Sequence, residues 1–76
     1  MRFEINFDEC EHTGDMDMYY GDIQDSGGKA DWNSITIDHD AETGSIEVEV
    51  DNIKDFTERF NKTDAADFAT FGRVIK

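Results

Sequence analysis

Hydrophobic and polar residues alternate at the start of the chain. Phe3, Ile5 and Phe7 are separated by polar residues, which is the period of a strand with one buried face. The polar stretch that follows ends in a glycine, as connections between elements often do. The sequence therefore predicts a half-buried strand over 1–8 and a connection over 9–14.

A weaker alternation follows this connection. It places Met16 and Met18 on the side that would be buried. The opposite, solvent-facing side would carry Asp15, Asp17 and Tyr19. This pattern predicts a second strand that ends near Ile23, before the glycine-containing loop 24–31.

The clearest local pattern is a hairpin. Apolar residues alternate with polar ones on both sides of the short segment 40–44. They are Ile35 and Ile37 before it, and Ile46, Val48 and Val50 after it. Because the segment ends in Gly44, we expect this glycine to supply a left-handed turn position between two antiparallel strands.

After Val50 the apolar period changes from 2 to about 3.6, which is typical of a helix. The apolar stripe of this segment consists of Ile53, Phe56 and Phe60. Asp51 or Asn52 can cap the helix start, so we predict a helix over 52–61. A short helical turn over 63–68 and a final β-prone segment, 71–75, complete the chain.

These elements predict an α+β fold in a single domain, 1–76. We expect a three- or four-stranded, mainly antiparallel sheet with the helix 52–61 packed on one face and a short C-terminal helical turn or strand. An antiparallel sheet can leave its other face in water. That face would then carry the outward residues Glu4, Asp8, Asp15, Asp17, Tyr19, Asp38, Glu47, Glu49 and Asp51.

Charge is distributed unevenly over this fold. Of the 76 residues, 1–51 contain fifteen acidic side chains and two basic ones, whereas 52–76 contain four acidic and five basic ones. Residues 1–51 therefore have a net charge of −13 and residues 52–76 a net charge of +1, which together give −12. Such a surplus raises solubility and opposes folding by self-repulsion, and it suits a partner whose surface is basic.

Other sequence features bear on the cellular compartment and on catalytic activity. The lone cysteine, Cys10, allows no internal disulfide, and no apolar run has the length of a signal peptide or a membrane span. We therefore expect a cytoplasmic protein without membrane contact. No Gly-rich phosphate loop, nucleophile elbow or catalytic set can be placed, so we expect neither enzyme activity nor a cofactor.

Carboxylates on neighbouring strands form a regular array, because residues i and i+2 lie about 7 Å apart and strands about 4.8 Å apart. Such an array imitates the phosphates that a Lys/Arg-lined groove binds. A tryptophan and a tyrosine in it would suit interface anchors, although the tryptophan can equally close one end of the core. The predicted partner-binding residues are Asp15, Asp17, Tyr19, Trp32, Asp38, Asp40, Glu42, Glu47, Glu49 and Asp51.

Three other uses of the acidic residues have weaker support. Asp38-x-Asp40-x-Glu42 resembles the start of a calcium loop, but the sixth position is Thr43 where that loop needs glycine. Cys10, His12 and His39 lack the paired spacing of a zinc site, so no metal is expected. Adaptation to high salt would explain the composition, but it predicts an excess of acidic residues over the whole surface, including the helix, whereas residues 52–76 are near neutral.

A short, proline-free and intensely acidic chain with Asp38, Asp40, Glu42, Glu47, Glu49 and Asp51 on a sheet resembles the anti-defence proteins of bacteriophages and mobile elements. These include DNA mimics of the anti-CRISPR and anti-restriction type. The resemblance covers size and charge and implies an inhibitor that occupies the basic nucleic-acid site of a CRISPR effector, restriction enzyme or other nuclease, without binding nucleic acid itself. Immunity proteins and antitoxins that neutralise a nuclease are the alternative.

Overall fold

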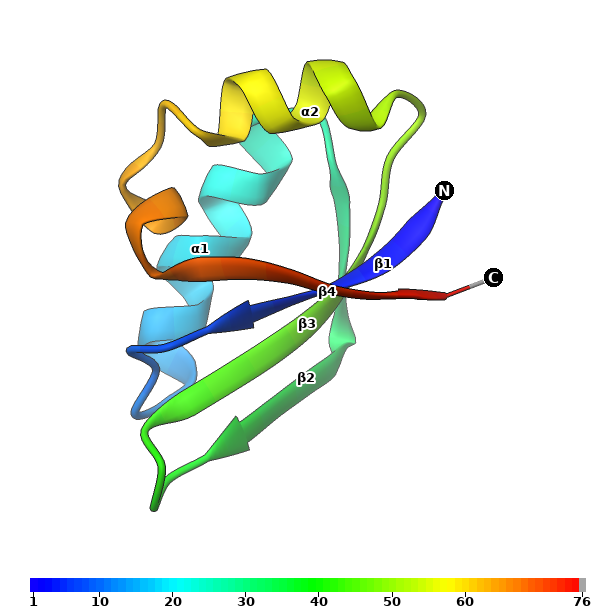
Figure 1. Ribbon diagram of the computed structural model, residues 1–76. Coiled ribbons are helices and arrows are strands. Elements are labelled where there is room, and N and C mark those ends of the chain that lie inside the picture. Colours follow the sequence, from blue (N-terminus) through cyan, green and yellow to red (C-terminus); the bar gives the residue numbers. More distant parts are fainter. Residues whose placement is uncertain (76) are drawn as a thin grey trace.

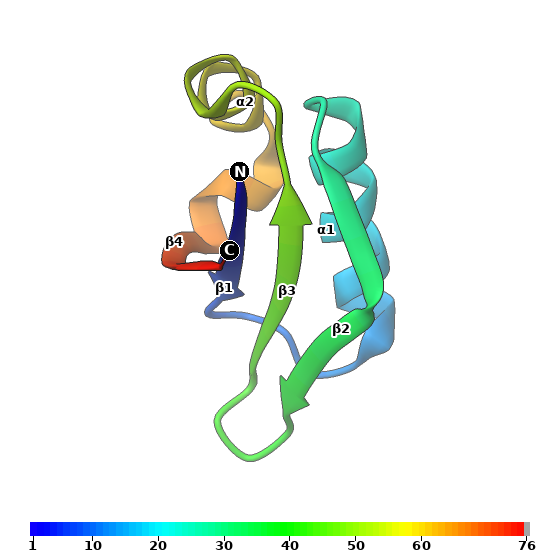
Figure 2. The same ribbon diagram turned by 90° about the vertical axis from the view of Figure 1, so that its right-hand side faces the viewer.

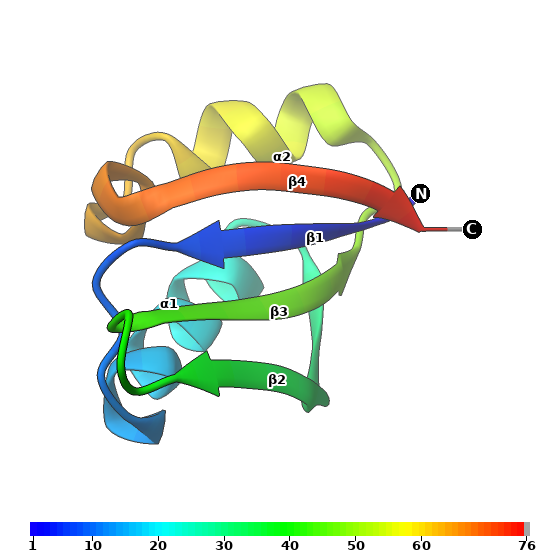
Figure 3. The ribbon, with the colours of Figure 1, turned by 60° about the horizontal axis from the view of Figure 1, so that its bottom comes forward.

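A computed structural model describes residues 1–75 and confirms an α+β fold. Four strands form one antiparallel sheet in the order β2-β3-β1-β4 (Figure 3). Strand β1 is Arg2–Phe7, β2 is Lys29–Asp38, β3 is Thr43–Glu49 and β4 is Ala69–Ile75. Helix α1, Thr13–Asp25, and helix α2, Ile53–Phe60, complete the layers with a short 3-10 helix, η1, Asp64–Phe68 (Figure 1).

The central strand β1 holds both helices against the same face of the sheet. Its three alternate apolar residues are almost inaccessible to solvent, as the sequence predicted. Phe7 stacks on Tyr19 of α1 with ring centroids 4.1 Å apart, and Phe3 meets Phe56 of α2 edge-on at 6.0 Å. The helices therefore form one layer and the sheet a second, with the core between them (Figure 2).

The prediction of a strand over 15–23 is wrong, because this segment is helix α1. Met16, Tyr19 and Ile23 are its buried residues, and their spacing of three and four positions is helical. The helix begins at His12, whose Nδ1 accepts a hydrogen bond from the backbone N–H of Gly14. The alternation of Asp and Met over four residues is too short to identify a strand.

Helix α1 ends in a Schellman motif built on two glycines. Gly27 has a φ of 92°, a conformation that glycine adopts without a steric penalty. The N–H of Gly28 donates to the carbonyl of Ile23, and the N–H of Gly27 donates to that of Gln24. The loop signal in the sequence thus corresponds to a tight turn from α1 directly into β2.

The predicted hairpin is confirmed, with a longer first strand than expected. Strand β2 begins at Lys29, and its pairing with β3 is interrupted between Asp31 and Thr36. The left-handed turn position was assigned to the wrong residue: Glu42 has a φ of 58°, whereas Gly44 lies buried in β3. A side chain at Gly44 would collide with the sulfur of Cys10, which explains the glycine there.

The C-terminal third follows its prediction closely. Asn52 caps α2 through its side-chain oxygen, which accepts hydrogen bonds from the N–H groups of Lys54 and Asp55. The turn η1 leads into β4, which pairs with β1 as the sheet's last strand. A single helix was predicted, so the second one, α1, is the main difference from the expected architecture.

The packing of the α1–β2 turn gives a first test. A methyl group at Gly28 would lie 2.7 Å from the ring of Phe56 and 2.9 Å from Ile23 Cγ2. Because this site is already filled, Gly28→Ala should lower the free energy of unfolding in urea by about 1–3 kcal/mol.

Gly21 provides the matched control. It lies inside α1, and no atom lies within 4 Å of the position of an added methyl group. Gly21→Ala should raise stability by about 0.5–1 kcal/mol through helix propensity. Equal effects of the two substitutions would contradict this packing of the turn against α2.

Candidate functional site

Seven carboxylates gather at one end of the molecule, which we call the acidic end. They come from the β1–α1 connection, the first turn of α1 and the β2–β3 turn, which lie together at the lower left of Figure 1. The acidic end consists of Asp8, Glu9, Glu11, Asp15, Asp38, Asp40 and Glu42. The contributing segments 8–15 and 38–42 contain no lysine or arginine.

Backbone hydrogen bonds join the two loops of the acidic end. The N–H of Cys10 donates to the carbonyl of Glu42 at 2.8 Å, and Nδ1 of His39 lies 2.7 Å from the carbonyl oxygen of Glu11. Asp38 orders its own turn by accepting from the N–H groups of Asp40 and the residue after it. The charged groups thus project from a fixed backbone.

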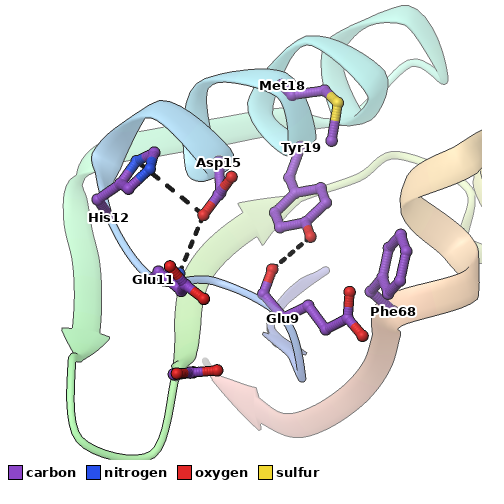
Figure 4. Close-up of a pocket in the computed structure, with 8 residues that line it drawn as sticks. Glu9, Glu11, His12, Asp15, Met18, Tyr19 and Phe68 are labelled. Atoms are coloured by element: carbon purple, nitrogen blue, oxygen red, sulfur yellow. Dashed lines mark hydrogen bonds and ion pairs between the residues drawn. The ribbon is translucent and has the colours of Figure 1, made fainter.

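A hollow of about 560 Å³ opens between these loops and α1 (Figure 4). Its lining combines four carboxylates, from Glu9, Glu11, Asp15 and Glu42, with His12 and with the apolar surfaces of Met18, Tyr19 and Phe68. Acidic rims around an apolar floor suit a long cationic side chain, because the stem of Lys or Arg packs on apolar atoms while its head meets carboxylates.

Tyr19 and Asp15 fix the inner wall of this hollow. The hydroxyl of Tyr19 donates to the carbonyl of Glu9, and Asp15 Oδ2 accepts from the N–H of Glu11 at 3.0 Å (Figure 4). Nδ1 of His12 lies 4.0 Å from the same Asp15 oxygen. Burial raises the pKa of Tyr19, and the negative charge of Asp15 raises it further.

The outer face of the sheet differs from the acidic surface that was predicted. Glu4 of β1, Glu47 of β3 and Asp31 of β2 form a row of like charges across three strands. Arg2 relieves their repulsion: its Nε donates to Glu47 at 3.0 Å, and its Nη2 donates to Asp31 at 3.1 Å. The hydrogen bond to Glu47 is the main reason why the pKa of Arg2 is raised.

The next row of the sheet alternates in sign, with Glu49 between Arg2 and Lys29. Glu47 and Glu49 therefore lie where the sequence placed them, but in a field of mixed charge. Asp51 follows β3 at the opposite end of the molecule from the β2–β3 turn. The ten predicted residues thus do not form one continuous surface.

Four of the predicted residues do not lie on the outer face of the sheet. Asp15 and Asp17 belong to α1, which covers the other face, and Asp17 is exposed there. The prediction that Tyr19 is an exposed interface anchor is wrong, because its side chain lies in the core and is only 2% exposed. Trp32 is 43% exposed on β2, but it meets the ring of Tyr20 of α1 edge-on at 5.3 Å, so it lies on the helix side and not on the predicted acidic face.

Sequence reasoning missed Glu9 and Glu11 because they occupy a segment assigned only as a connection. The available signal was the run of acidic residues 8–11, interrupted by Cys10 alone. Across residues 1–75, no group of three or more His, Cys, Asp or Glu side chains is arranged to hold a metal ion. Nor does the described part of the chain contain a helix of the length and apolarity needed to cross a bilayer.

Comparison of the chain with protein-family models, with curated proteins and with solved structures finds no match. The acidic end and the outer face of the sheet are therefore the structural features that bear on function.

The lone cysteine gives a second test. Cys10 is fully buried beside Gly44, and burial, together with the charge of Asp15, raises the pKa of its thiol. A raised pKa leaves less of the reactive thiolate at any given pH. Native protein at pH 8 should therefore react with iodoacetamide about a hundredfold or more slowly than protein unfolded in urea. Equal rates would show that the loop 8–12 does not cover the thiol.

Proposed function

We propose that this protein is an inhibitor that occupies the basic nucleic-acid-binding site of a bacterial defence or DNA-processing protein. The acidic end, which includes Asp38, Asp40 and Glu42 of the β2–β3 hairpin, is its main contact surface. The protein acts as a DNA mimic of the anti-CRISPR or anti-restriction type, working in the cytoplasm by binding and without catalysis.

The observation that carries this proposal is the uncompensated charge of the acidic end. The described chain has two ion pairs formed by arginine or lysine, and both involve Arg2 on the outer face of the sheet. The seven carboxylates of the acidic end have no such partner within residues 1–75. A cationic groove would supply the missing counter-charges, as it does for the phosphates of DNA.

Fixed geometry supports mimicry further. The hydrogen bonds between the two loops order the backbone before binding, so that less conformational entropy is lost on association. The charge also favours rapid encounter with a basic partner at low salt. Helix α2 contains Lys54 and Arg59 among its acidic residues, so the surplus is local, unlike the uniform acidity expected of salt adaptation.

Charge reversal at the acidic end tests the proposal directly. Glu11 and Asp40 are exposed, and their carboxylates accept no hydrogen bond within the described chain, so Glu11→Lys with Asp40→Lys should leave the fold intact. Two like-charge contacts in a basic groove should weaken binding by about a hundredfold or more. The measurement is capture of heparin-retained bacterial proteins on immobilised variants, with duplex DNA as the competitor.

The matched control reverses two acids within residues 52–76, the segment of near-neutral charge: Glu58→Lys with Asp64→Lys. Both side chains are exposed, and this variant has the same net charge as the first. It should capture the same proteins as the native chain. Equal loss of capture by both variants, or indifference to duplex DNA, would overturn the proposal. Capture of a nuclease toxin in place of a defence complex would favour the immunity-protein alternative.

Thermal unfolding separates this proposal from the calcium and salt-adaptation readings. The protein should unfold cooperatively in about 0.1 M salt without divalent ions, and added salt should raise its melting temperature modestly by screening repulsion. Circular dichroism with chelator, with calcium and in molar salt provides the comparison. A transition seen only with calcium would establish an ion site, and one seen only in molar salt would support salt adaptation.

A further inference from the structure

Strand β4 forms an open edge of the sheet opposite the hairpin edge. An edge strand offers unpaired N–H and C=O groups to another strand, and proteins commonly protect such edges with charge or broken pairing. The pairing of both edge strands has a register shift, but the other edge, β2, carries three charged residues, Lys29, Asp31 and Asp38. In β4, Arg73 is the one charged residue.

Exposed apolar side chains are concentrated along this edge. Phe71 is 37% exposed and Val74 is 58% exposed, and Met1, which precedes the neighbouring strand, is 53% exposed. Phe71 pairs with Ile5, and Val74 pairs with Phe3, so both face the helix layer. A β-bulge permits this, because Gly72 and Arg73 together lie opposite a single residue of β1.

The outer side of the same edge holds an unpaired acid and an unpaired base. A methyl group at Gly72 would lie 2.6 Å from Nδ2 of Asn6 and 3.5 Å from Oε1 of Glu4. These two side chains therefore lean across the glycine toward the edge (Figure 3 shows β4 beside β1). Within residues 1–75, neither Glu4 nor Arg73 forms an ion pair.

The charges at this edge fit a second copy of the chain, because each copy brings one Arg73 and one Glu4 that form no ion pair within residues 1–75. Two molecules of net charge −12 repel one another across most of their surfaces. The segment 52–76, which supplies β4 and the flanking α2, has a net charge of +1. Repulsion between two copies is therefore smallest where their β4 edges meet.

We propose that two copies of the protein pair through β4, antiparallel and around a two-fold axis, to give one continuous eight-stranded sheet. Phe71 of each copy lies opposite Val74 of the other on the helix side. On the outer side, Arg73 crosses Gly72 of the second copy and reaches Glu4 of that copy, about 10 Å away between Cα atoms at normal strand spacing. The interface is isologous, so each contact occurs twice.

This arrangement leaves the proposed inhibitory surface free. The hairpin β2–β3 lies on the other side of β1 from β4, and antiparallel pairing directs the two acidic ends toward opposite ends of the interface. The dimer then presents two equivalent acidic ends to basic partners. Dimerisation and partner binding use different residues and can be tested separately.

Sedimentation velocity from micromolar to millimolar protein in about 0.15 M salt measures the assembly. The native chain should sediment as a dimer at the upper concentrations. Val74→Glu should raise the dimer dissociation constant by about tenfold or more, because it places a carboxylate in the apolar contact. Met18→Glu is the matched control: Met18 is 52% exposed on α1, and its replacement adds the same charge away from β4.

Mixing two charge variants tests the proposed register between the β4 strands of the two copies. Arg73→Glu and Glu4→Arg should each be monomeric, because every Arg73–Glu4 contact becomes a pair of like charges. An equimolar mixture should form a heterodimer, since both contacts then join opposite charges. Circular dichroism must show native unfolding curves for each variant.

Three results would overturn the proposal. The first is a native chain that stays monomeric up to millimolar concentration. The second is a dimer that Val74→Glu and Met18→Glu affect equally, which would place the interface elsewhere. The third is loss of the dimer in both charge variants without recovery on mixing, which would exclude the contact between Arg73 and Glu4.

Discussion

Both helices depend on alternate residues of one central strand. Phe7 stacks on Tyr19 of α1, and Phe3 meets Phe56 of α2, so β1 holds the helix layer at two points along its length. With the apolar face of the sheet covered in this way, every carboxylate of strands β1 and β3 must point to the other face. The core therefore determines where charge can go, and the other acids lie on β2, in loops and on the exposed sides of the helices.

The fold accommodates its negative charge in two ways: ion pairs on the outer face of the sheet, and hydrogen bonds between the loops at the acidic end. On the rigid outer face, where acids oppose one another across strands, Arg2 binds two of them. At the acidic end, no arginine or lysine is supplied within the described chain, and hydrogen bonds between backbone groups hold the loops instead. Charge is thus balanced where strand pairing requires it and left unbalanced where a partner can reach it.

The sequence predicted elements correctly where a period and a cap agreed. In α2, an apolar stripe follows the cap residue Asn52, and in β1 three apolar residues alternate without exception. For 13–25, the two signals conflicted: Asp15 to Met18 alternate as in a strand, whereas Met16, Tyr19 and Ile23 recur as in a helix. The cap His12 is not among the strongly preferred cap residues, so no start signal resolved the conflict.

The candidate site was predicted only in part, because local sequence patterns identify some of its residues and not others. Asp38, Asp40 and Glu42 follow from the hairpin, whose turn could be placed from its flanking strands. Glu9 and Glu11 join them only through contacts between loops distant in sequence, such as the hydrogen bond from Cys10 to Glu42, and no local pattern encodes such contacts. Tyr19 was misplaced because its face depended on the wrong secondary structure.

The strand order separates the acidic β2–β3 hairpin from the near-neutral strand β4. The near-neutral final strand adds beside β1, and the hairpin lies on the opposite side, so β4 and β2 are separated by two strands, or about 14 Å at normal strand spacing. The screening length at physiological salt is about 8 Å, so charges at one edge act only weakly on the other. A different strand order would place the final strand next to the acidic hairpin. The observed order places the acidic hairpin and the proposed dimer edge on opposite sides of β1.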